Sequence, residues 1–159
     1  MKDIISLYEE KGISAVQKGL KRKKIEINDV NDLGYNYLMT SLQREYIDLA
    51  FFLVQNGVNL LHVDSKGRSI LHFVEIYDYE QLVYEIIEKE QKLLNIIDFY
   101  GNQPLWTAVM ADAGFGNKVN IIKRFLSLGA QTNHKNKVGR SPISISKDLG
   151  YKEVLECFN

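Results

Sequence analysis

The chain has 159 residues, and its 20 Lys and Arg residues balance its 20 Asp and Glu residues, so its net charge is zero. A content of 45% hydrophobic and 25% charged residues is typical of a folded globular protein and excludes a disordered chain. The neutral balance argues against nucleic acid as a partner, and the single Cys157 excludes a disulfide framework and a cysteine-based zinc site. No apolar run is long enough for a membrane helix, and the acidic residues near the start argue against a signal peptide, so we expect a cytoplasmic protein.

Residues 1–30 are predicted to form a pair of helices that caps the fold. Apolar residues begin at Ile4, stop at Gly12 and resume at Ile13, which indicates two short amphipathic helices with a break between them. The basic run Lys21–Lys24 follows. We interpret it as a solvated outer surface, with a nuclear address or a nucleic-acid patch as the alternative.

Four later segments share one spacing, in which Asp or Asn stands three residues before Gly. They are NDLGYNYLMTSL, DSKGRSILHFVE, DFYGNQPLWTAV and NKVGRSPISISK, and their glycines (Gly34, Gly67, Gly101 and Gly139) stand 33, 34 and 38 residues apart. Glycine suits a tight turn with positive φ, and Ser two residues later suits the cap of a following helix. Pro104 and Pro142 then fall at the first helical position, where a missing N–H has no cost.

A second helix is predicted in each unit, because apolar pairs such as Leu49-Ala50 and Leu53-Val54 recur with helical spacing. Gly57 and Gly129 follow two of these helices as stop residues. The third unit is longer by about five residues, which places an insertion at 113–118, between its two helices. Phe115 in this insertion either fills a local gap or protrudes toward a partner, and we favour the first interpretation.

These segments resemble the ankyrin repeat, whose period is 33 residues and whose signature contains Thr-Pro-Leu-His-x-Ala. The segment GRSILHF at 67–73 places Ser, Leu and His at signature positions, and Pro104-Leu105 and Ser141-Pro142 match in later repeats. The resemblance implies an all-α solenoid of stacked helix–turn–helix units with hairpin-like loops. We expect a single domain, 1–159, that consists of the 1–30 cap and four repeats, at about 31–63, 64–97, 98–135 and 136–159.

The resemblance also implies where a partner binds, namely at loop tips beside the shared Gly and at exposed positions of the first helix. Aromatic and arginine side chains there are expected to dominate the binding energy. Glu75 stands out because the family expects a small apolar residue at its position. The predicted partner-binding residues are Tyr35, Arg44, Lys66, Arg68, Glu75, Tyr77, Tyr79, Phe99, Tyr100, Asn102, Asp112 and Arg140.

The sequence contains no motif that indicates catalysis. His72 occupies the signature position where the ring bonds loop backbone, and His62 and His134 lie in loops two repeats apart, too far for a shared metal. No nucleophile motif, metalloprotease motif or phosphate-binding loop occurs. We therefore predict a protein that is not an enzyme and that has no catalytic residue, metal, cofactor or small-molecule substrate.

The charges are unevenly distributed along the chain. Residues 75–92 hold six acids and two bases, and residues 118–153 hold eight bases and two acids. The surface is therefore predicted to be bipolar, unless each patch only solvates its own helices.

The predicted function is non-catalytic binding of a folded partner protein. We expect the chain to occlude its partner, as a bacterial immunity protein neutralises its cognate toxin. The alternative is an adaptor or secreted effector that recruits host proteins. Neither prediction involves nucleic acid or a membrane.

Overall fold

The chain is helical in a computed structural model that describes residues 3–75 and 79–159, with only the backbone described at 74–75. One isolated antiparallel bridge, between Val30 and Asn36, is the only extended pairing within those ranges. The predicted all-α class is confirmed. The helices are α1 (Ile4–Lys21), α2 (Tyr37–Gln43), α3 (Ile47–Gln55), the 3-10 helix η1 (Ile70–Glu75), α4 (Glu80–Lys89), the 3-10 helix η2 (Gln91–Asn95), α5 (Pro104–Asp112), α6 (Val119–Ser127), α7 (Pro142–Leu149) and α8 (Lys152–Glu156).

These helices form two compact units, Met1–Ser65 and Lys66–Asn159. In the first unit, α1 packs against the hairpin formed by α2 and α3. The predicted break is present, since Gly12 has φ 70° and ψ −177° and separates α1 into two helical parts. Ile4, Val16, Leu38, Leu49 and Leu53 are fully buried and form the core that joins these helices.

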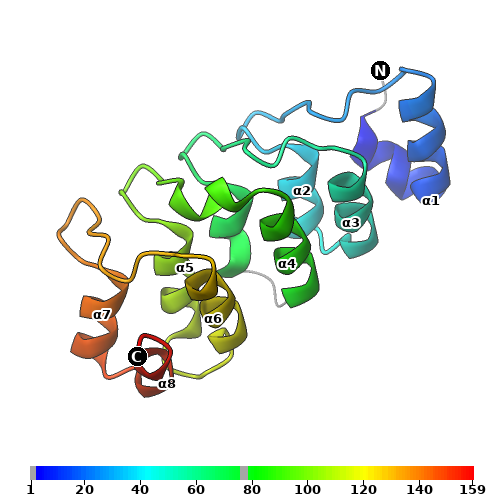
Figure 1. The fold of residues 1–159 in the computed structure, drawn as a ribbon. Helices are drawn as coiled ribbons and strands as arrows, with labels where there is room; N and C mark the ends of the chain where they lie inside the picture. Colours follow the sequence, from blue (N-terminus) through cyan, green and yellow to red (C-terminus); the bar gives the residue numbers. More distant parts are fainter. Residues whose placement is uncertain (1–2, 76–78) are drawn as a thin grey trace. The chain divides into compact units, whose positions relative to one another are not determined.

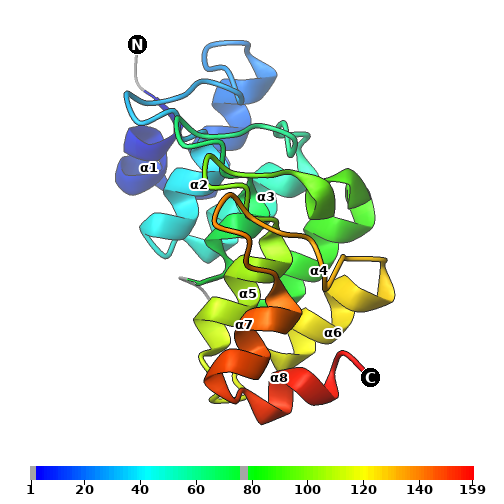
Figure 2. The same ribbon diagram turned by 90° about the vertical axis from the view of Figure 1, so that its left-hand side faces the viewer.

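The described part of the second unit contains three helix pairs in two layers, with the 3-10 helix η2 between α4 and α5 in the chain. The first helices of the pairs pack side by side, with α5 between η1 and α7, and the second helices do the same, with α6 between α4 and α8 (Figures 1 and 2). Each second helix buries the apolar pairs that the sequence indicates, for example Leu82-Val83 and Ile86-Ile87 on α4. Removing such side chains from water is the main source of stability, at about 25 cal/mol per Å².

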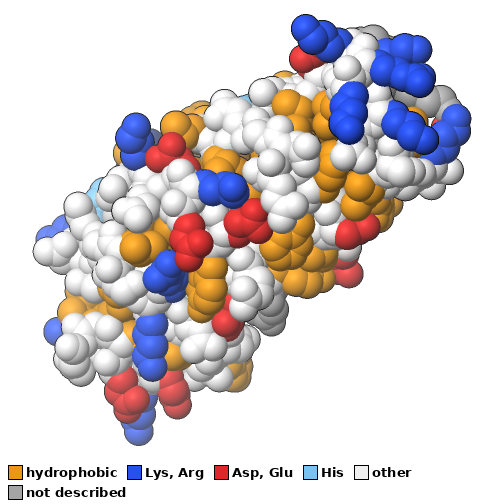
Figure 3. Space-filling view, turned by 45° about the vertical axis from the view of Figure 1, so that its right-hand side comes forward, with side chains coloured by type: hydrophobic (Ala, Val, Ile, Leu, Met, Phe, Trp, Pro, Cys, Tyr) orange, Lys and Arg blue, Asp and Glu red, His pale blue; other side chains and the backbone are white. Residues whose placement is uncertain are grey.

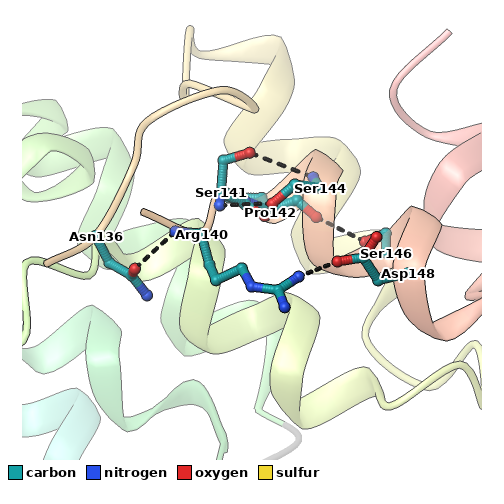
Figure 4. Close-up of polar contacts among 7 residues, drawn as sticks. All are labelled: Asn136, Arg140, Ser141, Pro142, Ser144, Ser146 and Asp148. Carbon is teal, nitrogen blue, oxygen red and sulfur yellow. Dashed lines mark hydrogen bonds and ion pairs between the residues drawn. The ribbon is translucent and has the colours of Figure 1, made fainter. Parts of the chain in front are cut away.

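The helix starts follow from local chemistry. Pro104 and Pro142 occupy the first turns of α5 and α7, as predicted. Ser141 caps α7 through a reciprocal pair with Ser144: its hydroxyl accepts the Ser144 N–H at 3.2 Å, and its own N–H donates to the Ser144 hydroxyl at 2.9 Å (Figure 4). Ser69 differs, because its hydroxyl lies 3.0 Å from Nδ1 of His72, so this serine pairs with a ring.

The helix η1, which precedes α4, differs in type from its counterpart α5. It is a 3-10 helix, Ile70–Glu75, where its counterpart α5 is an α-helix of nine residues. The burial of apolar side chains holds the segment against α5, with Phe73 and Leu71 each 1% exposed.

Candidate protein-binding surface

The hairpin turns that carry the predicted surface are built by the shared Asp or Asn. Asp98 Oδ1 accepts the N–H groups of Tyr100 and Asn102, both at 2.8 Å, and the Gly101 N–H donates to the Asp98 carbonyl at 2.9 Å. Asn31 and Asn136 accept the equivalent pairs of N–H groups in their own turns. The side chain of Asp or Asn thus fixes these three turns, which explains its constant distance from the glycine.

Successive turns are joined by one backbone hydrogen bond, repeated at the same place. In each case, the residue after the Asp or Asn donates to the carbonyl of the residue before the preceding glycine. Within the first unit the bond joins Ser65 N to Leu33 O at 3.3 Å, and within the second unit it joins Phe99 N to Lys66 O and Lys137 N to Tyr100 O, both at 2.9 Å.

The glycines allow this close approach. A Cβ at Gly34 would lie 2.8 Å from the Ser65 nitrogen, and one at Gly101 would lie 3.0 Å from the Lys137 nitrogen. Both glycines also have positive φ, 75° and 81°. The shared glycine therefore serves both the turn and the contact with the next turn.

All three histidines brace these loops. His62 Nε2 donates to the Gly34 carbonyl at 2.6 Å, and His134 Nε2 donates to the Gly101 carbonyl at 2.9 Å. His72, 1% exposed, accepts the Ser69 N–H on Nδ1 at 3.1 Å, so Nε2 carries the proton that it donates to the Asn102 carbonyl at 3.0 Å. The predicted structural role of His72 is confirmed.

Phe99 and Tyr100 are two large aromatic side chains exposed on one turn of the second unit. Their backbones are fixed by the bonds described above, yet the residues are 62% and 65% exposed. The Phe99 ring lies over Gly67, where a Cβ would be 3.1 Å from its Cδ1 atom. In the preceding turn Lys66 is exposed, and the guanidinium of Arg68 lies 4.7 Å from the centre of the Phe73 ring.

Arg140 also lies at the surface. Its guanidinium pairs with the Asp148 carboxylate on α7, and both side chains are about half exposed (Figure 4). An exposed ion pair of this kind contributes little to stability, so Arg140 can leave Asp148 and pair with a carboxylate of a partner protein at a small cost in free energy.

In the first unit, Tyr35 and Arg44 line one hollow of about 290 Å³ together with Glu9, Tyr37 and Thr40. Arg44 pairs with the Glu9 carboxylate, which also accepts the Tyr46 hydroxyl at 2.8 Å. Sequence reasoning missed Tyr37 and Thr40. They stand seven and four residues before Arg44 along α2, and this spacing is the signal that places all three on one helix face.

Two predicted contact residues belong to the scaffold instead. The prediction that Asp112 is exposed is wrong: the residue is 0% exposed, and its carboxylate accepts the N–H groups of Gly114, Gly116 and Lys118 at 3.1, 3.1 and 2.8 Å. Asn102 is half-buried, and its amide donates to Asp98 at 3.1 Å and accepts from Asn136 at 2.9 Å. A side chain whose polar atoms are used inside the fold has little left to offer a partner.

Phe115 corrects a further expectation. The sequence favours a gap-filling role, but the residue is 82% exposed. The loop around it closes on the Asp112 carboxylate, and its Gly114 lies so close to Tyr151 that a Cβ would be 2.8 Å from the ring. The loop is therefore held together without the Phe115 ring, which is left to protrude.

Three more of the predicted contact residues lie between η1 and α4 or at the ends of these helices. Tyr79 is half-buried at the start of α4. Tyr77 lies outside the described residues, and so does the side chain of Glu75. The functional prediction for these two positions stays a prediction.

The acidic and basic blocks meet inside the second unit. Arg124 on α6 pairs with Glu88 on α4 at 3.1 Å and lies 5.8 Å from the Tyr84 ring centre, and Asn120 donates to Glu80 at 2.9 Å. Part of the predicted bipolar charge is thus neutralised between neighbouring helices.

The described residues contain no group of three or more His, Cys, Asp and Glu residues that would hold a metal ion. Burial raises the pKa of the Cys157 thiol, whose Sγ lies 3.2 Å from the Glu153 carbonyl. A raised pKa disfavours the reactive thiolate. Within the same residues, no helix combines the length and hydrophobicity needed to cross a membrane.

No family model matches the chain, but the chain is distantly similar to known proteins, among them the two that follow. Over 107 residues, 65% of the chain, it is 30% identical to the phosphocholine transferase AnkX of Legionella pneumophila. Over 126 residues, 78% of the chain, it is 26% identical to the NF-kappa-B inhibitor zeta of Bos taurus. The matches span only 11% and 16% of those proteins. Both similarities suggest ankyrin repeats, as the signature residues do.

Proposed function

We propose that the chain is an ankyrin-type solenoid that binds a partner protein through its hairpin turns. The proposal includes a cap at 1–30 and four repeats, at about 31–63, 64–97, 98–135 and 136–159. The observation that supports it best is the combination of a fixed backbone and exposed side chains at Phe99 and Tyr100.

Such a surface is suited to binding because little order is lost when a partner docks. The turn that carries Phe99 and Tyr100 is already fixed by Asp98, so a partner immobilises side chains and leaves the loop unchanged. Exposed Tyr and Arg residues commonly supply most of the binding energy of a protein interface. The proposed contact residues are Tyr35, Arg44, Lys66, Arg68, Tyr79, Phe99, Tyr100 and Arg140.

The biological role that we propose is occlusion: the chain acts in the cytoplasm as an immunity protein that covers a cognate toxin. Fixed turns favour a tight complex with one partner, because affinity gained from preorganisation takes the form of slow dissociation. The distant similarity to a Legionella phosphocholine transferase supports a second proposal, in which the chain is an adaptor or secreted effector that recruits host proteins.

The binding proposal is tested by affinity capture from the native organism with the double variant Phe99→Ala and Tyr100→Ala. The matched control is Leu149→Ala, which removes an apolar side chain that is 52% exposed at the end of α7. We expect the double variant to lose the partner captured by the wild type, while the control retains it. Equal capture by all three proteins contradicts the proposal, provided that their thermal unfolding curves coincide.

The two roles are separated by identifying the captured protein. An immunity protein restores growth to cells that express its captured toxin, and the Phe99→Ala and Tyr100→Ala variant fails to do so. Capture of host proteins together with an absence of growth rescue supports the adaptor or effector instead.

A further inference from the structure

A basic groove on α1 lies outside the surface described so far. Residues 11–25 contain six Lys and Arg residues and no Asp or Glu, although the whole chain is neutral. Figure 3 shows blue Lys and Arg side chains gathered over the α1 region. The groove measures about 500 Å³, and its lining includes the bases Lys11, Lys18, Arg22 and Lys24 and the apolar residues Leu7 and Ile25.

The groove forms because the chain turns back at the end of α1. Lys24 N donates to the Gly19 carbonyl at 3.0 Å, and this turn returns Ile25 to the helix. Gly19 permits the contact, since a Cβ there would lie 2.8 Å from the Ile25 Cδ1 atom. The result is an apolar floor beneath four bases, with no carboxylate among the lining residues.

We propose that this groove binds an acidic segment of a protein partner, with carboxylates on the bases and an apolar side chain on the floor. The inference rests on the proposed protein-binding function and adds the chemistry of the partner. A groove of this volume accommodates a few side chains of an extended segment. Four bases in a lining without an acid select negative charge, and the floor selects an apolar residue between the charges.

Other anionic partners fit the groove less well. Single-stranded nucleic acid binds where its bases stack on aromatic side chains, and the lining contains none. A membrane surface receives exposed apolar side chains, but within the described part of residues 1–25 no large hydrophobic residue is exposed. The buried Ile25 and half-buried Leu7 form a recess instead.

The proposal is tested by fluorescence anisotropy with the full chain and a labelled peptide of about ten residues, in which a Leu follows every two Glu. The variant Lys18→Glu with Arg22→Glu is expected to bind about tenfold more weakly than the wild type. The matched control is Lys147→Glu with Lys152→Glu, which makes the same change of net charge in the second unit and is expected to bind within about twofold of the wild type. Should the charge-reversed protein fail to fold, Lys11→Gln with Lys24→Gln is the milder substitute.

The apolar floor needs its own test. Ala15→Phe fills the groove, whose lining includes Ala15, without changing a charge. This variant is expected to bind the Glu-Leu peptide severalfold more weakly than the wild type does. A peptide of Glu alone is expected to bind the wild type more weakly than the Glu-Leu peptide does. The proposal is overturned if the Lys18 and Arg22 variant binds as the wild type does, or if Ala15→Phe has no effect. Tighter binding of oligothymidylate or of phosphatidylserine vesicles overturns it as well.

Failure here is distinguishable from failure of the proposed function. If partner capture depends on Phe99 and Tyr100 but the peptide does not bind at α1, the proposed hairpin surface is supported and only the groove proposal is contradicted. If the peptide binds at α1 but capture does not depend on Phe99 and Tyr100, the groove proposal is supported and the proposed hairpin surface is contradicted.

Discussion

Adding a methyl group at Gly101 tests whether stacked turns hold neighbouring helix pairs together. Gly101 and Gly139 occupy equivalent positions with φ of 81° and 76°. A Cβ at Gly101 would lie 3.0 Å from the Lys137 nitrogen, whereas a Cβ at Gly139 would meet nothing within 4 Å. Gly101→Ala and Gly139→Ala therefore differ in the contact and share the backbone strain.

The expected free energies follow from that difference. Positive φ costs an alanine roughly 1–2 kcal/mol, partly offset by about 0.5 kcal/mol because alanine restricts the unfolded chain. Gly139→Ala is thus expected to lose about 1 kcal/mol. Gly101→Ala also displaces Lys137, which donates to Tyr100 at 2.9 Å, and a bond of this kind contributes about 1 kcal/mol. With the neighbouring Asn136–Asn102 bond weakened as well, the expected total is about 2–3 kcal/mol.

Urea unfolding followed by circular dichroism measures both losses, and amide hydrogen exchange at Lys137 reports the local contact. We expect faster exchange of this amide in Gly101→Ala and no change in Gly139→Ala. Equal losses of stability in the two variants would refute the reasoning, because they would show that the turn strain accounts for everything and the stacked turns for nothing.

Three further predictions concern the core, the insertion and the alkaline limit of stability. Leu71→Ala should cost about 2–5 kcal/mol in urea unfolding, because the residue is 1% exposed between η1 and α5 and its loss leaves a cavity. Asp112→Ala should lower the free energy of unfolding by about 2–4 kcal/mol, because it removes the acceptor of three N–H groups, and Asp112→Asn should lower it by about half as much. Wild-type stability in both variants would show that the loop does not depend on the Asp112 carboxylate. The hydrogen bond from Tyr8 to Asp48 at 2.6 Å, with burial, raises the pKa of Tyr8 from 10.0 to about 12. Because the folded state then disfavours the phenolate, the stabilisation by Tyr8 is complete below pH 10 and is lost as the pH rises to about 12. The free energy of unfolding of Tyr8→Phe should therefore fall less steeply over that pH range than that of the wild type.

The features predicted well from the sequence are those set by neighbouring residues. An Asp or Asn side chain reaches N–H groups only two and four residues away, so its distance from the glycine reveals the turn. The prolines at the starts of α5 and α7 and the break at Gly12 are equally local. The apolar pairs of the second helices follow from the helical period.

The features predicted poorly depend on residues distant in the sequence, or on polar side chains that can either face solvent or accept hydrogen bonds inside the fold. Exposure of Phe115 follows from the way Asp112 and Tyr151 support its loop, and Tyr151 lies in the next helix pair. Asp112 itself has the chemistry of a surface residue and is buried only because three N–H groups surround it. The pairing of Glu88 with Arg124 likewise requires knowing which helices are neighbours.

That same pairing of α4 with α6 bears on how the helix pairs find their neighbours during folding. Helices with similar apolar faces risk docking against the wrong neighbour. Glu80 and Glu88 on α4 meet Asn120 and Arg124 on α6, whereas two acidic helices brought together would repel. The uneven charge thus distinguishes helices whose apolar faces are alike, and it favours the pairing of an acidic helix with a basic one.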